Sequence, residues 1–288
     1  MDNLLFGLEE LGITKTNGVD IFGEEINDNR PSALAKATIA TEQKEVDFLF
    51  EKTMTCPVCD KSFKTKQVKI GKPRFIGTDT DLRPRYEIVD TVKYDAVVCL
   101  HCGYGELMRN FNNISSRQIK LVKENICNTF KGITNELGEY SYPVALQRYK
   151  LTLYNGVVKH SKLSERAFIC LKIAWLYRAQ IESLPKDTID YDKIAREYAI
   201  NELMFTKNAY EGFFKAIEKE MPPICGMDDT TINYMLSDLA RRCQDYENAE
   251  KFAFAVLGSR SASAKIKEKA RAELLIIKDQ KASSNKNI

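Results

Sequence analysis

The stretch of residues 54–109 reads MTCPVCDKSFKTKQVKIGKPRFIGTDTDLRPRYEIVDTVKYDAVVCLHCGYGELMR, and a C-x-x-C pair stands near each end. The two pairs have 39 residues between them. A C-x-x-C turn directs two sulfurs toward one point, and a tetrahedral metal such as Zn²⁺ takes four such ligands. Two pairs around a β segment are typical of a metal site. We therefore predict one metal ion bound by Cys56, Cys59, Cys99 and Cys102.

Zinc in a structural role is the interpretation that this pattern favours. A catalytic zinc keeps an open coordination position, whereas four thiolates close the site. Iron in a rubredoxin-like site is the alternative, because a tetrahedron of sulfurs suits either metal. His101 stands between two ligands and is expected to point away from the metal, and Gly103 can take a left-handed conformation after the second pair.

The segment between the pairs carries most of the remaining chemistry of this region. Strand-like alternation interrupted by Gly71, Pro73, Gly77 and Pro84 predicts a small β unit with an inserted hairpin. The charged residues of the run GTDTDLRPRY have two possible roles. They either converge on an anionic ligand or a partner carboxylate, or they hold the inserted hairpin (the insert) against the zinc-ribbon-like β unit that carries the cysteine pairs (the ribbon). The candidate contact residues are Lys72, Arg74, Asp79, Asp81, Arg83, Arg85 and Tyr86.

Nucleic acid is a second class of partner for this region. Residues 51–110 hold eleven basic and eight acidic residues. Phe63, Phe75, Tyr86 and Tyr94 interleave with the basic residues, and a basic groove with aromatic side chains is typical of single-strand binding. A solvated sheet face with internal ion pairs is the alternative. The net charge of +3 does not by itself imply nucleic-acid binding.

From Ser115 the hydrophobic period becomes helical. Apolar residues at steps of three and four predict a first helix that ends near Gly138; they are Ile119, Val122, Ile126, Phe130, Ile133 and Leu137. Further helices are predicted at 141–159, 164–183, 189–220 (as one helix or as two), 229–243, 246–259 and 263–279. Residues 228–231 supply N-cap chemistry for the helix at 229–243. Helices joined by short loops favour antiparallel hairpins.

One pair of these helices resembles a tetratricopeptide unit. In the run LSDLARRCQDYENAEKFAFAVL, residues 236–257, Leu236 and Ser237 occupy the first helix and Ala249 the second. Ala253 departs from this pattern, because a large aromatic residue is usual there. A helical bundle without repeats is the alternative, since a repeat array needs about three units.

The predicted fold class is α+β and mostly α, with a small zinc-ribbon-like β unit followed by a tetratricopeptide-like antiparallel helical array. The predicted parts are a flexible acidic segment or linker at 1–47, the ribbon at 48–112, the helical domain at 113–280 and a disordered tail at 281–288. Leu4, Leu8 and Leu11 share one helical face in the first part, which is either a short capping helix or a docking peptide.

The order of motifs also resembles a known family. C-P-V-C-D-K-S-F-K-T-K, then G-K-P-R-F-I-G-T-D-T-D-L-R-P-R-Y, then Y-D-A-V-V-C-L-H-C-G-Y and helices with A-W-L-Y-R are similar to the bacterial family called domain of unknown function 2225, over residues 48–278. The resemblance implies a zinc-ribbon-like N-terminal part, a tetratricopeptide-like C-terminal part and no assigned activity. Leu100 departs from the family, in which proline is usual at that position.

Composition places the chain among soluble cytoplasmic proteins. Hydrophobic residues make up 44% and charged residues 29%, no apolar run has the length of a membrane span, and the acidic N-terminus lacks the basic region of a secretory signal. In a reducing compartment we expect thiols rather than disulfides at Cys127, Cys170, Cys225 and Cys243.

The leading functional hypothesis is a non-enzymatic adaptor that binds a protein or peptide through its helices. A nucleic-acid-binding module that uses the basic face of the ribbon is the alternative. An enzyme or ligand sensor built on Asp79, Asp81, Arg83 and Arg85 is a third hypothesis, although the sequence shows no nucleophile paired with a base and no phosphate-binding loop.

Overall fold

The computed structural model describes residues 43–285. Residues 1–42, with most of the predicted acidic segment and its Leu4–Leu11 face, lie outside the described residues, as do residues 286–288 of the predicted tail. From Gln43 onward the chain is one compact unit. It begins with the short 3₁₀ helix η2 (Glu45–Phe48).

The β part consists of three antiparallel pairs within the described residues. They are β1 (Leu49–Thr55) with β2 (Ser62–Val68), β3 (Phe75–Thr78) with β4 (Pro84–Tyr86), and β5 (Ala96–Val98) with β6 (Gly105–Leu107). The first and third pairs each have a C-x-x-C turn at the tip, as predicted. The second pair is the predicted inserted hairpin, and the 3₁₀ helix η3 (Thr91–Tyr94) links it to β5.

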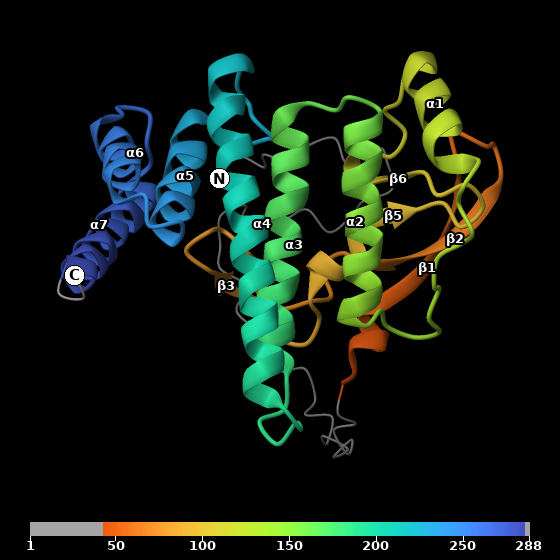
Figure 1. Ribbon diagram of the computed structural model, residues 1–288, viewed down its shortest axis with the longest axis horizontal. Coiled ribbons are helices and arrows are strands. Elements are labelled where there is room, and N and C mark those ends of the chain that lie inside the picture. The colour runs from red at the N-terminus through yellow and green to blue at the C-terminus, as the bar shows by residue number, and fades with distance from the viewer. Residues whose placement is uncertain (1–42, 286–288) are drawn as a thin grey trace, which may run out of the picture. The chain divides into compact units, whose positions relative to one another are not determined.

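The helical part follows the sequence periodicity closely. It contains α2 (Tyr142–Val158), α3 (Leu163–Ser183), α4 (Tyr191–Lys219), α5 (Asp229–Arg242), α6 (Tyr246–Gly258) and α7 (Ala264–Asn285). In Figure 1 α2, α3 and α4 stand side by side in one layer, and α5, α6 and α7 continue the array beyond α4. The predicted fold class is confirmed. None of the described helices is both long and apolar enough to cross a membrane.

The predicted helix before Gly138 is wrong over its second half. α1 spans only Ser116–Val122, a π turn follows at Lys123–Cys127, and residues 128–140 are not helical. Buried cations explain this, because Arg148 donates to the carbonyl of Thr134 at 3.3 Å and Lys66 donates to the carbonyl of Glu136. A helix interior would already have used those carbonyls for its own hydrogen bonds.

The helical hairpins pack closely at small residues. A β-carbon added at Gly212 of α4 would lie 2.8 Å from the β-carbon of Ala167 in α3. In the next hairpin the hydroxyl of Ser237 in α5 donates to the carbonyl of Ala249 in α6 at 2.8 Å. The Asp228 carboxylate accepts from the N–H of Thr231 at 2.7 Å, so α5 has the predicted N-cap.

The ribbon and the helices contribute to one hydrophobic core. Val92, Ala96 and Leu107 from the β part are buried in the same cluster as Trp175 and Leu176 of α3. α3 is apolar on most of its surface because α2, α4 and the β part cover it. The core therefore fixes the position of the β part relative to α2 and α3.

Candidate metal centre and ion-pair network

The first two candidate ligands lie in the turn between β1 and β2. The N–H of Cys56 donates to the carbonyl of Lys61 at 3.1 Å, and the N–H of Asp60 donates to the carbonyl of Cys56 at 2.9 Å. Asp60 takes a left-handed conformation with φ 59°. These bonds close the turn and leave the sulfurs of Cys56 and Cys59 near each other.

The turn between β5 and β6 repeats this arrangement. The N–H of Cys99 donates to the carbonyl of Tyr104 at 2.8 Å, and the N–H of Gly103 donates to Cys99 at 3.0 Å. Gly103 has φ 75°, as the sequence indicated. A β-carbon here would lie 2.6 Å from the ring of Phe130, so the position needs glycine for space as well as for conformation.

The sulfurs of the two turns meet in one cluster. All four lie within 4.8 Å of one another. The sulfur of Cys56 is 3.6 Å from that of Cys102, and the sulfur of Cys59 is 3.7 Å from that of Cys99. Zinc–sulfur bonds of about 2.3 Å in a tetrahedron place the sulfurs roughly 3.8 Å apart. The four predicted ligands therefore fit a tetrahedral metal ion, and thiolates suit both zinc and iron.

Aromatic residues shield the cluster from water. Cys56, Cys99 and Cys102 are buried, and Cys59 is half-buried. Tyr104 is also buried, and its hydroxyl donates to the carbonyl of Phe111 at 3.0 Å. The N–H of Val58 lies 3.4 Å from the sulfur of Cys56 and donates to it. Backbone donors of this kind stabilise thiolate charge in a closed site.

The thiols also perturb one another. Hydrogen bonds from Cys102 and Cys56 hold the pKa of Cys99 well below its usual range. Hydrogen bonds with Cys56 and Cys99 raise the pKa of Cys102. Metal binding needs thiolates, so an ion bound by these cysteines would displace the thiol protons.

Two other residues lie close to the cluster. His101 is exposed, and its Nε2 is 3.0 Å from the carbonyl oxygen of Ser62, so the ring is held at the surface of the turn. Cys127, in the π turn after α1, packs against the hydrophobic cluster that contains the ligands. No pattern in the sequence indicated that Cys127 would lie beside the ligands, because a helical period does not specify tertiary contacts.

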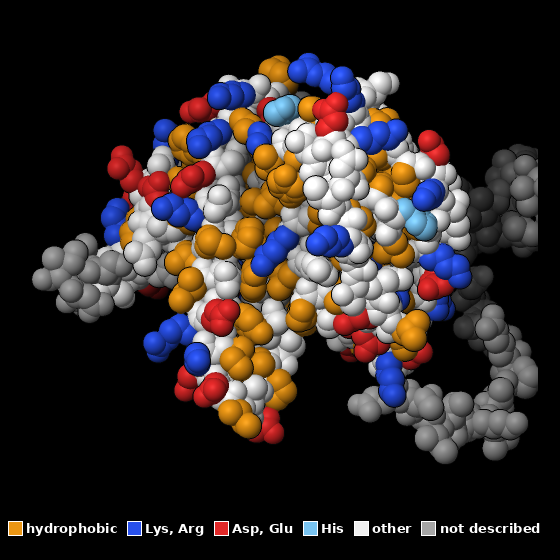
Figure 2. Space-filling model, turned by 45° about the vertical axis from the view of Figure 1, so that its right-hand side comes forward, with side chains coloured by type: hydrophobic (Ala, Val, Ile, Leu, Met, Phe, Trp, Pro, Cys, Tyr) orange, Lys and Arg blue, Asp and Glu red, His pale blue; other side chains and the backbone are white. Residues whose placement is uncertain are grey.

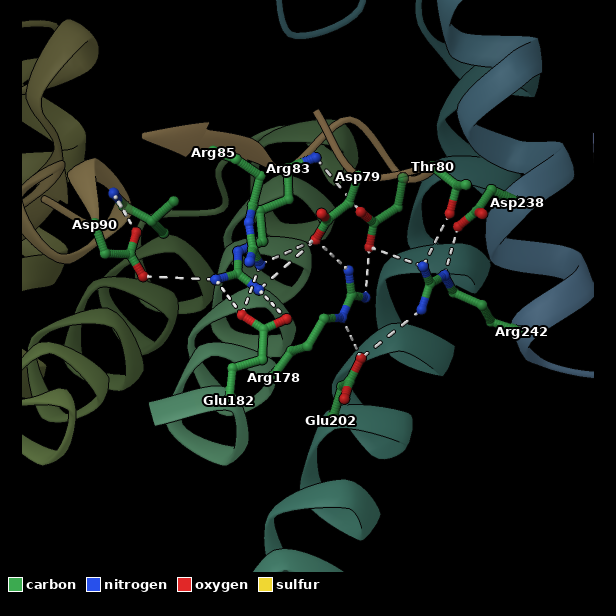
Figure 3. A network of polar contacts seen from close by, with 12 residues as sticks. Asp79, Thr80, Arg83, Arg85, Asp90, Arg178, Glu182, Glu202, Asp238 and Arg242 are labelled. Carbon is green, nitrogen blue, oxygen red and sulfur yellow. Dashed lines mark hydrogen bonds and ion pairs between the residues drawn. The ribbon is translucent and has the colours of Figure 1, made fainter. Parts of the chain in front are cut away.

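The charged residues of the insert contact the helices. Asp81, at the tip of the β3–β4 hairpin, is fully buried, and its carboxylate lies 2.6 Å from Arg178 of α3 and 3.8 Å from Arg242 of α5. Arg178 also contacts Asp79 at 3.2 Å and Glu202 of α4 at 2.7 Å. Figure 3 shows Asp79, Arg178, Glu202 and Arg242 meeting between the hairpin and three helices.

Two arginines of the insert share one carboxylate of α3. Arg83 contacts Glu182 at 3.1 Å and Arg85 contacts it at 2.6 Å, and Arg83 is almost fully buried. Arg83 also lies 3.7 Å from Asp79 and 4.0 Å from Asp90. These residues form internal contacts that join the insert to α3 and α5, whereas the internal alternative predicted from the sequence was contact with the ribbon.

Burial and charge oppose each other at Asp81. Burial by itself would raise the pKa of this carboxyl, but Arg178 and Arg242 hold it below its usual range. The same contacts raise the pKa of Arg178 against the effect of its own burial. Both groups therefore stay charged in the interior, where separating them would leave an unpaired buried charge.

Two of the remaining predicted contact residues lie at the surface, and the third, Tyr86, is half-buried. Lys72 and Arg74 are exposed, and Arg74 is 3.5 Å from Glu87. Tyr86 packs edge-on against Phe75, with ring centroids 5.5 Å apart. The four aromatics of the proposed nucleic-acid groove do not form one surface, because two of them, Phe63 and Tyr94, are buried in the core.

The helical partners in the network were not predicted from the sequence: Arg178 and Glu182 of α3, Glu202 of α4 and Arg242 of α5. A signal existed for one of them. Arg178 is a charged residue near the end of the apolar run AFICLKIAWLYRAQ, and a cation on a helix that is buried on most sides needs an acidic partner. The position of that partner depends on tertiary contacts.

Comparison with known proteins supports the resemblance seen in the motifs. The family model described as "Uncharacterized protein conserved in bacteria (DUF2225)" matches residues 49–277, which include both cysteine pairs and the insert. No curated protein and no solved structure matches the chain. Because this model covers most of the sequence, the chain belongs to the DUF2225 family of bacterial proteins.

Proposed function

We propose that the protein is a cytoplasmic, non-enzymatic adaptor, in which a structural zinc ion stabilises the β part and the helical array binds a protein or peptide. The main observation behind this proposal is the cluster of four sulfurs within 4.8 Å of one another, enclosed by buried aromatic residues. Four thiolates leave a zinc ion no open position for substrate, so its role is to stabilise the fold. Zinc would be held by Cys56, Cys59, Cys99 and Cys102.

The ion-pair network supports an adaptor rather than an enzyme. Asp79, Asp81, Arg83 and Arg85 are engaged with Arg178 and Glu182 of α3, and Asp81 also with Arg242 of α5, so their charges serve internal contacts. Leu82, between them, packs against the cores formed by α3 and by α5, α6 and α7. The insert thus braces successive helices of the array against one another. A partner would then bind a face that the insert does not cover.

The close α5–α6 contact at Ser237 and Ala249 supports a tetratricopeptide-like array as part of this proposal. In such arrays, stacked helix pairs present an extended surface for peptides. The exposed apolar residues of α4, among them Ile200 at 63% and Leu203 at 52% relative exposure, lie on the same array. They offer surface for a partner.

Metal analysis and peptide selection test the two halves of the proposal. Mass spectrometry of the untagged protein, with an optical spectrum of the same sample, is expected to give one colourless zinc ion per chain. One iron ion per chain, together with visible thiolate charge-transfer bands, would show that the bound metal is iron and not zinc. Selection from a displayed peptide library on the metal-loaded chain is expected to enrich one peptide class. Failure to enrich any, together with salt-dependent binding of labelled single strands, would favour the nucleic-acid alternative.

A further inference from the structure

We infer that the cavity between the loop that precedes α2 and the end of the α3–α4 hairpin is the peptide site, and that it takes an extended, proline-containing segment flanked by basic residues. This inference rests on the proposed adaptor function and names the site and the partner. The cavity has a volume of about 860 Å³. In Figure 2 the lower side of the molecule is notched beside a protruding end that carries hydrophobic side chains.

Tyrosine and proline side chains dominate the apolar lining. Tyr140, Tyr142 and Pro143 come from the loop and the start of α2, and Pro185 and Tyr198 come from the α3–α4 connection and α4. Grooves lined by aromatic rings bind proline-rich segments in the polyproline II conformation, because the flat rings pack against pyrrolidine rings. This conformation is already extended before binding, so little ordering is needed.

The rings are held in position without a ligand. Tyr140 stacks on Tyr94 with centroids 5.4 Å apart, and Arg148 lies 4.3 Å from the centre of the Tyr140 ring. The hydroxyl of Tyr142 donates to Asp90 at 3.3 Å. Tyr198 packs against Tyr177 at 6.2 Å. A preformed wall of this kind lowers the cost of binding, because few side chains have to be immobilised.

Two buried polar atoms of the lining lack a partner within the described residues. They are the hydroxyl of Tyr140, a residue that is 1% exposed, and Oε1 of Gln180 in α3. The first can donate to a peptide carbonyl and the second can accept from a peptide N–H. A polyproline II segment has no internal hydrogen bonds, so its backbone groups are free to meet both atoms.

The rim is acidic. Glu136 and Glu139 line the cavity, together with Glu45 and Lys93, which pair with each other at 2.6 Å. The carboxylate of Glu136 accepts hydrogen bonds from the N–H and the hydroxyl of Ser141, which are neutral donors. Lys66 and Arg148 lie near enough to attract these carboxylates, but they donate hydrogen bonds to the backbone carbonyls of Glu136 and Thr134 instead. Basic residues that flank the proline segment would complement the carboxylates of the rim.

Other modes of peptide binding fit less well. The lining residues belong to loops and helices, so the cavity offers no strand edge for a peptide to extend as a sheet. The main-chain groups of a helix are already paired with one another, so they could not bond to the two unpartnered atoms of the lining. A short extended segment is the form of peptide that this space admits.

The test is fluorescence anisotropy with the full chain in its metal-loaded form and a short labelled peptide of the type R-P-x-x-P-R. Two matched peptides carry alanine in place of proline or glutamate in place of arginine. We expect the first peptide to bind best and both replacements to weaken binding. Equal binding of all three peptides would overturn the inference.

Two variants locate the site, each with a matched control. Tyr198→Ala is expected to weaken binding about tenfold, since aromatic anchors dominate such interfaces. Its control is Tyr154→Ala, at an exposed position of α2 outside the cavity lining. Glu139→Lys is expected to weaken binding about fivefold, and its control is Glu268→Lys on the exposed side of α7. Binding is compared only for variants whose thermal unfolding matches that of the native chain.

The outcomes separate this inference from the adaptor proposal. Binding that both cavity variants weaken, and that both controls leave unchanged, supports the inference. If an acidic or helix-forming peptide from the selection binds instead, and the cavity variants do not affect it, the inference is wrong while the adaptor proposal stands. If no peptide class binds the metal-loaded chain, both are wrong.

Discussion

The carboxylate of Asp81 lies 2.6 Å from the guanidinium of Arg178, although 97 residues separate them in the chain. Asp81 is fully buried at the tip of the inserted hairpin, and Arg178 lies near the end of the longest apolar run of α3. This contact joins the polypeptide between the cysteine pairs to the helical array. It makes the insert an internal brace, and its charges become a measurable part of the stability of the fold.

Replacing Asp81 by Asn is expected to destabilise the protein by about 3 kcal/mol at neutral pH, because Arg178 would lose its closest carboxylate while it remains largely buried. The measurement is the free energy of unfolding from urea titration. Lys64→Met, which removes an exposed contact with Glu51, serves as the control and should change stability by less than about 1 kcal/mol.

The same pair predicts a pH dependence. The pKa of Asp81 is lower in the folded chain than in the unfolded chain, so the unfolded state binds more protons as the pH falls. The contribution of Asp81 is therefore complete above the unfolded pKa of about 3.9 and is lost as the pH falls through the lower folded value. The difference in stability between native chain and Asp81→Asn should shrink over that window. A difference that stays constant down to the lowest pH at which the chain folds would contradict this account.

Replacing Cys99 by Ser is expected to abolish stoichiometric zinc binding and to loosen the β part, because one of four ligands is lost. The readouts are metal content and hydrogen exchange of the β5–β6 amides. Cys243→Ser changes a thiol at the end of α5, away from the cluster, and should retain one metal ion per chain. Retention of one zinc ion by Cys99→Ser as well would argue against the proposed site.

Two glycines with similar φ angles allow the stability cost of backbone strain to be measured apart from the cost of overpacking. Gly71 has φ 71° with no atom within 4 Å of an added β-carbon, whereas Gly103 has φ 75° with the Phe130 ring at 2.6 Å. Replacing Gly71 by Ala is expected to lower the free energy of unfolding by about 1 kcal/mol, because only the positive φ is strained. Alanine at Gly103 should cost about 1–3 kcal/mol more from overpacking, and should also weaken zinc retention. Equal losses in urea titration would show that Phe130 moves aside freely.

Leu82 allows a test of the brace that does not involve charge. Its backbone is left-handed, with φ 67°, while its side chain packs against the core of the helices. Both Leu82→Ala and Leu82→Gly lose this packing, but glycine relieves the backbone strain. We expect the glycine variant to be about 1 kcal/mol more stable than the alanine variant, the reverse of the order in a helix interior. The comparison is made by urea titration of both.

Local patterns in the sequence were sufficient for several features. The spacing of the cysteine pairs predicted two hairpin tips that meet, because four thiolates around one point satisfy a tetrahedral ion. The helical period from residue 141 onward predicted α2 to α6 to within two residues, since these helices end at a cap or at a Pro or Gly break. The end of α7 was wrong, because this helix continues to Asn285, past the predicted end at residue 279 and into the predicted disordered tail. These features depend on neighbours a few residues away.

Tertiary structure decided the rest. The apolar residues from Phe130 to Leu137 have a helical period, yet the segment is not helical, because its carbonyls accept from Arg148 of the next helix and from Lys66 of β2, 70 residues from Glu136. The partners of Asp81 and Arg83 lie on α3 and α5, and no local pattern indicates which cation meets which carboxylate. The sequence thus determined which side chains could pair. Only the packing of distant segments, where each buried charge must find a counter-charge, decided which pairs form.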